Sequence, residues 1–280
     1  MMLTSQQEER LLPVTTDRQR LSTILSNLTE TKEKIQKDPK VYYNQEKDKR
    51  MIEQYYSTVD FKNTNHKEFI QSLQQLVQKT HTNEVRYDPS EYVYPWVDLR
   101  PEGNLKSIYS GQQRQAEEVI KEDHATSVKR KEEIKKSGAS DQKQVESKLV
   151  QIANDFKYNC EHSVPQSWFN EQEPMRGDLH HLFTCEPVCN SIRSNYPYHD
   201  FTDYNPGKIK TNRIEESCGK ANENLFEPEH AKGTVARAML YFLLRYPDAI
   251  EQQYKDKIDT ALLLDWHQKV PLLFTKNIAI

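Results

Sequence analysis

Apolar residues in the first 85 positions recur at the spacing of an α-helix. Residues three and four apart lie on one face of a helix, so this pattern predicts three amphipathic helices. No chemically reactive residue is interleaved with the apolar ones, which is typical of packing surfaces. We therefore interpret residues 1–85 as an N-terminal helical extension that serves as scaffold, binds a protein partner or self-associates. The three stripes are Leu21, Ile24, Leu25 and Leu28; Met51, Ile52, Tyr55, Tyr56 and Val59; and Phe69, Leu73, Leu76 and Val77.

The pattern changes in the stretch "YDPSEYVYPWVDLRPEGNLKSIYSG". Aromatic and β-branched residues cluster there, Pro-Glu-Gly-Asn marks a turn, and Gly111 closes the run. Such residues favour strands, and turn residues between two runs favour a hairpin. We expect a β-hairpin with strands near 92–99 and 104–109.

Charged residues dominate positions 112 to about 150, which we interpret as a charged helical insert with a flexible Ser-Gly-Ala-Ser break. The basic run from Lys129 to Lys136 can in principle contact nucleic acid. Glu132 and Glu133 interrupt it, so the pattern favours an exposed, salt-bridged helix.

Apolar helices return in the last third of the chain. The stretch "AKGTVARAMLYFLLRYP" places Val235, Met239, Phe242 and Tyr246 on one face and ends at Pro247. A second apolar helix is expected in "IDTALLLDWHQKVP". Together the patterns predict a mainly helical α+β fold, with the N-terminal extension followed by a second domain over residues 86–280.

Composition limits the binding partners. Of the residues, 35% are hydrophobic and 29% are charged, and the net charge is −3. No global positive field attracts an acidic partner, so any phosphate binding must be local. The chain has no 18-residue apolar run and no visible secretory signal, so we expect no membrane partner and the cytoplasm as the simplest compartment. Secretion by another route stays open.

Two dense stretches carry the candidate chemistry. "CEHSVPQSWF" places Glu161 beside His162, and a dozen residues later "PMRGDLHHLFTCEPVCNSIRSNYPYHDF" begins. Pro187 suits the first turn of a helix and Pro197 cannot continue one, so a short helix over 188–195 is expected. Asn190 and Arg193 are three apart and share a face of it.

These four residues suit phosphodiester cleavage. A carboxylate and an amide oxygen, with several waters, are ligands that Mg²⁺ prefers, and Mn²⁺ or Ca²⁺ are alternatives. A neutral imidazole removes a proton from the attacking water, and a guanidinium holds a phosphate oxygen. Successive strand side chains point to opposite faces, so Glu161 and His162 are expected where the strand ends or bends.

Five ordered blocks resemble the bacterial endonuclease I family, which comprises nonspecific nucleases with a ββα-metal, HNH-like site. They are "EHSVPQSWF", "MRGDLHHLF", "CNSIRSNYPY", "FEPEHAKGTVARAMLYFLLRY" and "LLLDWHQKVP", across roughly residues 158–275. The hairpin near 92–110 is similar to that family's lead-in segment. The resemblance implies that His162 is the general base and that Glu161 and Asn190 are metal ligands. It also implies a metal-dependent endonuclease that hydrolyses DNA, and RNA as well, with little sequence specificity and leaves 5′-phosphate ends.

The chain departs from the family pattern between the first two blocks, where some members carry a phosphate-binding arginine. Here the interval is only "NEQEP". We assign that role to Arg193, with Arg176 as the alternative. Backbone phosphates of DNA or RNA are expected to contact both arginines together with Lys208, Lys210 and Arg213. His180 and His181 are interpreted as supporting or packing groups.

All four cysteines fall between Cys160 and Cys218. Cys160 is expected on the strand face opposite Glu161, and Cys189 is expected to turn away from Asn190. Three states stay open: a structural Zn²⁺ site formed by Cys160, Cys185, Cys189 and Cys218; free buried thiols; or disulfides.

A second function also stays open. In it, the protein is a catalytically silent nucleic-acid-binding or partner-recruiting protein on the same fold. Retention of Glu161, His162 and Asn190 together favours the enzyme.

Overall fold

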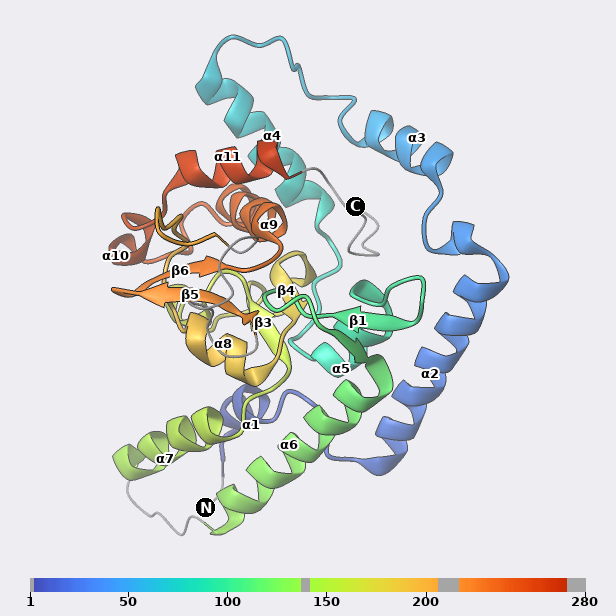
Figure 1. The fold of residues 1–280 in the computed structure, drawn as a ribbon, viewed down its shortest axis with the longest axis vertical. Helices are drawn as coiled ribbons and strands as arrows, with labels where there is room; N and C mark the ends of the chain where they lie inside the picture. Colours follow the sequence, from blue (N-terminus) through green and yellow to red (C-terminus); the bar gives the residue numbers. More distant parts are fainter. Residues whose placement is uncertain (1–2, 137–141, 206–216, 271–280) are drawn as a thin grey trace.

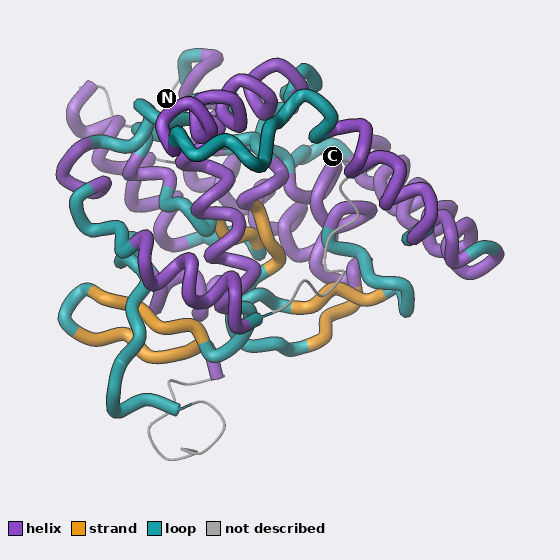
Figure 2. Tube along the Cα trace, turned by 90° about the horizontal axis from the view of Figure 1, so that it is seen from above, coloured by secondary structure: helices purple, strands orange, loops and turns teal. Residues whose placement is uncertain are grey.

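A computed structural model describes residues 3–136, 142–205 and 217–270 and has a mainly helical α+β architecture (Figure 1). The fold has three small two-stranded antiparallel sheets: one lies among the helices, and the other two lie at one edge of the molecule in Figure 2. The helices are α1 Ser5–Leu11, α2 Arg18–Lys37, α3 Gln45–Tyr55, α4 His66–Thr80, α5 Pro89–Tyr92, α6 Ala116–Lys136, α7 Gln142–Asp155, α8 Pro187–Arg193, α9 Lys232–Arg245, α10 Gln252–Lys255 and α11 Thr260–Lys269. Short helical turns occupy Pro39–Val41, Val93–Val97, Gln166–Trp168 and Leu179–His181. The strands are β1 Asn104–Lys106, β2 Gln113–Gln115, β3 Cys160–His162, β4 Leu182–Thr184, β5 Gly219–Asn222 and β6 Leu225–Pro228.

The three helices predicted from the N-terminal stripes are confirmed as α2, α3 and α4. Each begins at a residue whose side chain accepts a hydrogen bond from the first turn: Asp17, Asn44 and Asn65. These caps satisfy backbone N–H groups that have no partner within the helix. Local sequence therefore sets where these helices begin.

The predicted hairpin is wrong in its first strand. Residues 89–97 form α5 and one turn of π-helix, because Asp88 caps the helix start and Pro89 occupies its first position. The second predicted strand is confirmed only as β1, whose partner is β2 rather than 92–99. Tertiary burial of Val93, Tyr94 and Val97 accounts for the aromatic and β-branched residues that suggested a strand.

The charged insert forms α6 and α7, as expected. The first of them, α6, is not exposed on all sides, because Val119, Ile120 and Ile134 are buried. Two of them join a core cluster with Ile24 and Leu28 of α2 and Val93 of the π turn. The insert and the N-terminal extension therefore share one hydrophobic core.

A second core cluster lies under α9 and α11. Val235, Met239, Phe242 and Tyr246 are all buried in it, which confirms the face predicted for α9. This cluster supports β3, β4 and α8 from one side through Phe183 and Cys189. Among the described helices, none is both long and apolar enough to cross a membrane.

Candidate active site

The candidate residues lie on a strand, strand and helix arrangement made of β3, β4 and α8. β3 pairs antiparallel with β4, so that Glu161 lies opposite Phe183 and His162 opposite Leu182. Glu186 and Pro187 then turn the chain into α8. The short helix expected at 188–195 is confirmed, with bounds shifted by one or two residues.

Two side chains on one face of α8 fasten the helix to β3. Nδ2 of Asn190 donates to the carbonyl oxygen of Cys160 at 2.9 Å, and Nη2 of Arg193 donates to that of Ser163 at 2.9 Å. These carbonyls flank the Glu161–His162 pair on either side. The predicted shared face of Asn190 and Arg193 is therefore confirmed, and it holds the pair in place.

Glu161 is 3% exposed and lies on the α8 side of β3. Its Oε1 accepts a hydrogen bond from the Tyr109 hydroxyl at 2.8 Å and lies 3.1 Å from Nε of Arg193. Burial raises the pKa of this carboxyl to about 7, and the Arg193 charge opposes that rise. Glu161 thus has one cation beside it and little water around it.

Arg193, to which the sequence analysis assigned phosphate binding, is fully buried. Its Nη1 donates to the Ser194 carbonyl at 3.0 Å, in addition to the bond to Ser163 and the pairing with Glu161. Burial opposes the charged form, but Tyr198, Tyr109 and Glu161 outweigh it and raise the pKa of the guanidinium further. Arg193 is therefore a charged structural partner of Glu161 in this conformation.

His162 points to the opposite face of β3. Its Nε2 lies 2.9 Å from the Arg176 carbonyl oxygen, and its ring lies 4.7 Å from the Tyr87 ring and 5.4 Å from the His181 ring. Because a carbonyl can only accept, Nε2 carries the hydrogen and Nδ1 keeps the lone pair. Burial, with the charge of His181 as a second cause, lowers the pKa of the imidazole well below its usual value, so the ring is neutral.

The pair was expected where the strand ends or bends, and it lies at the end, because β3 ends at His162. Both residues keep regular pairing with β4, and their side chains alternate as strand side chains do. Cys160 and His162 share the face that carries Tyr87, whereas Glu161 faces Tyr109. The strand therefore separates the base candidate from the carboxylate, and Cys160 lies opposite Glu161 as predicted.

Arg176, the alternative phosphate-binding residue, is also buried. Its Nε donates to Oε1 of Gln166 at 2.8 Å and its Nη2 to the Arg10 carbonyl at 2.7 Å, while the guanidinium lies over the Tyr87 ring. These contacts tie the N-terminal segment to the His162 side of β3. Lys208, Lys210 and Arg213 lie outside the described residues.

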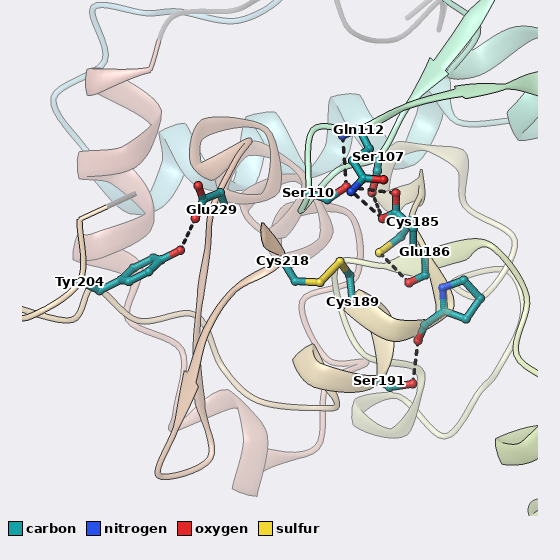
Figure 3. Close-up of a disulfide and its surroundings, with 11 residues drawn as sticks. Ser107, Ser110, Gln112, Cys185, Glu186, Cys189, Ser191, Tyr204, Cys218 and Glu229 are labelled. Carbon is teal, nitrogen blue, oxygen red and sulfur yellow. Dashed lines mark hydrogen bonds between the residues drawn. A yellow bond between two sulfur atoms is a disulfide. The ribbon is translucent and has the colours of Figure 1, made fainter. Parts of the chain in front are cut away.

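The cysteines form one disulfide, so the four-cysteine zinc site is wrong. Cys189 on α8 is bonded to Cys218, with Cα atoms 5.1 Å apart, as Figure 3 shows. A disulfide sulfur cannot serve as a thiolate ligand. Cys160 and Cys185 are buried and form no disulfide among the described residues, and Cys160 belongs to a different core cluster from the other three. Of the three predicted states, the disulfide therefore applies to Cys189 and Cys218, and the buried thiol applies to Cys160 and Cys185.

Among the described residues, sequence reasoning missed one group of possible metal ligands, where the Leu179–His181 turn packs against α9. His81, Asp178 and His180 place ligand atoms within 4.8 Å of one another. Both Asp178 oxygens already accept hydrogen bonds, from Nδ1 of His180 at 2.8 Å and from the hydroxyls of Tyr241 and Tyr246 at 2.9 and 3.0 Å. In the sequence, the only sign of this group is that His180 lies two residues after Asp178, because His81 is almost a hundred residues away from both.

Comparison with known proteins bears on what this arrangement does. The Endonuclease I family model matches residues 102–275. The chain belongs to the endonuclease I family. As a member of that family it is a nuclease, a hydrolase whose substrate is nucleic acid, and such nucleases typically depend on a divalent metal. The family match starts at β1 and includes α6 and α7, which the five sequence blocks did not reach. None of the curated proteins compared with the chain matches it.

Proposed function

We propose that this endonuclease I family member is a divalent-metal-dependent endonuclease that hydrolyses DNA and RNA with little sequence preference and leaves 5′-phosphate ends. The observation that carries the proposal is the fastening of α8 to β3, which sets Asn190 against the residue before Glu161. The helix thereby brings an amide and a carboxylate to one side of a single strand. This arrangement supports β3–β4–α8 as the proposed counterpart of the ββα-metal element that the sequence resemblance implies.

Glu161 and Asn190 would hold the cation. A carboxylate oxygen and a neutral amide oxygen, with water in the other positions, are chemically suited to Mg²⁺, and Mn²⁺ or Ca²⁺ accept the same donors. Because Nδ2 of Asn190 is bonded to the Cys160 carbonyl, the amide oxygen is the atom available for a ligand. When bound, the cation polarises the scissile phosphate and stabilises the leaving oxygen.

His162 acts as the general base in this proposal. The Arg176 carbonyl fixes the tautomer, so Nδ1 is the atom that accepts the proton of the attacking water. Its lowered pKa keeps it unprotonated at neutral pH. Since the Tyr87 ring covers His162 and β3 separates it from Glu161, the proposal includes a displacement at this end of β3 when substrate binds.

Plasmid nicking by the full chain tests the proposal. We expect cleavage of supercoiled plasmid in Mg²⁺, loss of cleavage in EDTA, and products that T4 ligase can rejoin because they carry 5′-phosphates. A single-stranded RNA of mixed sequence tests the RNA activity separately. Absence of cleavage in Mg²⁺, Mn²⁺ and Ca²⁺ would reject the enzymatic function.

The second candidate is a catalytically silent nucleic-acid-binding protein whose N-terminal helices recruit a partner. The burial of Glu161 and His162, which are 3% and 5% exposed, favours it, because a resting site open to substrate would expose at least one of them. Retained nucleic-acid binding without nicking would support this candidate.

The compartment is a separate proposal. The sequence favours the cytoplasm, but a Cys189–Cys218 disulfide is more typical of an oxidising compartment. We therefore propose that the protein acts in an oxidising compartment.

A further inference from the structure

A cavity of about 490 Å³ opens beside the β3–β4–α8 arrangement. Its walls come from β2, α6, the segment that leads into β3, and the start of α8. Lys129 lies on the α6 wall and Lys157 on the β3 wall, and Pro187 lies at the start of α8. We refer to this space as the Lys129–Lys157 cavity.

Three cationic and two anionic side chains line the cavity, which leaves its lining with a net charge of +1. Arg114 is paired with Glu122 at 2.7 Å, so these two charges offset each other. Glu186 also lines the cavity, and its carboxylate accepts hydrogen bonds from Ser110 at 3.0 Å and from Ser107 (Figure 3).

Among the described residues, neither Lys129 nor Lys157 takes part in an ion pair that would neutralise it. Other salt bridges of α6 join Lys121 with Glu117 and Lys136 with Glu133. The cavity therefore holds a local excess of positive charge on a chain whose net charge is −3.

The cavity is next to the candidate active site. Lys157 precedes β3 by three residues, and Asn159, which also lines the cavity, is followed directly by the strand. Lys157 is half-buried, and burial lowers the pKa of its ammonium group while the negative charge of Glu161 raises it. The same ammonium charge acts on Glu161. An anion bound to Lys157 in the cavity would thus lie at the entry to the strand that carries the carboxylate proposed to hold the metal.

The arginines predicted to contact phosphate are unavailable for that role in this conformation. Arg193 is fully buried against Glu161 and the Ser163 carbonyl, and Arg176 is buried against Gln166 and the Arg10 carbonyl. A nuclease needs cations for the phosphates beside the cleaved bond, because phosphate contacts set the position of the substrate. Lys129 and Lys157 supply two of them.

We propose that the Lys129–Lys157 cavity binds a backbone phosphate of the nucleic-acid substrate, next to the phosphate that is cleaved. The inference rests on the proposed function and extends it by naming a substrate-positioning subsite on α6. Contact through phosphate reads no base, so the subsite suits cleavage with little sequence preference. It also gives Lys129, the first residue of the basic run, the nucleic-acid contact that was the less favoured interpretation of the sequence.

The test measures binding of a fluorescein-labelled 20-base-pair DNA duplex in EDTA as the salt concentration is varied. Each phosphate contact that is removed lowers the slope of log Kobs against log salt by about 0.9. We expect the slopes of Lys129→Gln and Lys157→Gln each to be smaller than the wild-type slope by roughly that amount. The decrease should be the same on two duplexes of unrelated sequence. Lys129→Arg and Lys157→Arg keep the charge and should keep the wild-type slope.

Lys135→Gln is the matched control, because it removes one charge from an exposed position on the same helix. It lies six residues after Lys129 and about 120° around the helix from it. Thermal unfolding of each variant shows that it is folded before binding is compared.

Slopes unchanged from wild type for both glutamine variants overturn the subsite. If wild type nicks plasmid and only the subsite fails, the proposed function stands without it. If wild type neither binds nor cleaves nucleic acid, both the proposed function and the subsite are rejected.

Discussion

Nε of Arg193 lies 3.1 Å from Oε1 of Glu161, and both side chains are buried. The pair joins the end of α8 to the middle of β3, and the Tyr109 hydroxyl donates to the same carboxylate oxygen. Removal of one partner from such a pair leaves a buried charge without compensation. The pair is therefore a structural requirement of the site, whatever chemistry the site performs.

Replacement of Arg193 should destabilise the protein strongly. We expect Arg193→Ala to lower the free energy of unfolding by about 3–5 kcal/mol, measured by urea denaturation. Arg193→Lys should recover part of the loss, since it restores the charge but not the fork that reaches the Ser163 carbonyl. Arg86→Ala, which removes an exposed ion pair with Glu9, is the control and should cost at most about 1 kcal/mol. Equal losses for the two alanine variants would contradict the buried-pair argument.

His162→Ala should reduce plasmid nicking by at least about a hundredfold, the lower range for loss of a general base. The reason is that the neutral Nδ1 is the proposed proton acceptor. Initial nicking rates in saturating Mg²⁺ measure the effect, and thermal unfolding shows that the variant folds. His66→Ala, at the exposed start of α4, should nick at the wild-type rate. Near-normal turnover of the His162 variant would remove it from the mechanism.

Asn190→Ala should raise the Mg²⁺ concentration needed for half-maximal nicking and lower the maximal rate as well. The alanine variant lacks both the proposed ligand oxygen and the Nδ2 bond to the Cys160 carbonyl. Mg²⁺ titrations of the nicking rate separate the two effects. Ser191→Ala, on the exposed face of the same helix, is the control and should titrate like wild type. An unchanged Mg²⁺ requirement in the Asn190 variant would argue against a ligand role.

The disulfide predicts a specific thiol count. Unfolded protein without reductant should show two reactive thiols, from Cys160 and Cys185, and four after reduction. Metal analysis should find no stoichiometric zinc. Cys189→Ser should cost about 3 kcal/mol of stability, because the bond closes a loop of about 30 residues. Four thiols without reductant, or one zinc per chain, would contradict this assignment.

Asp123 should make stability depend on pH. It is fully buried and accepts hydrogen bonds from the Tyr94 hydroxyl and the Asn159 amide, yet burial raises its pKa to about 6. Between about pH 4 and 6 the unfolded chain has lost the proton that the folded protein retains, so this group lowers the free energy of unfolding as pH rises.

Asp123→Asn removes that contribution. The difference in unfolding free energy between wild type and this variant should fall by up to roughly 3 kcal/mol from pH 4 to pH 6 and then stay level. Urea denaturation at pH 4, 5, 6 and 7 measures it. Asp155→Asn, at the exposed end of α7, is the control for loss of a surface carboxylate. A constant difference across the series would mean that Asp123 is ionised throughout.

The sequence by itself determined the helices and the candidate chemistry. Apolar stripes and capping residues located α2, α3 and α4, because helix periodicity and end caps depend on neighbours within four residues. The spacing of Asn190 and Arg193 placed both on one face of α8 for the same reason. Five ordered blocks also indicated the family that the comparison then showed.

Only the tertiary structure decided how those residues meet. Residues 92–99 were predicted as a strand because aromatic and β-branched residues cluster there. In the structure, Val93 and Tyr94 are buried against helices that are distant in the chain, and a local pattern does not reveal such burial. The separation of His162 from Glu161 follows from the pairing of β3 with β4, and the Cys189–Cys218 bond joins positions 29 residues apart. Lys129 and Lys157 line one cavity because α6 packs beside the entry to β3. Each relationship depends on contacts between segments far apart in the chain, which no local pattern encodes.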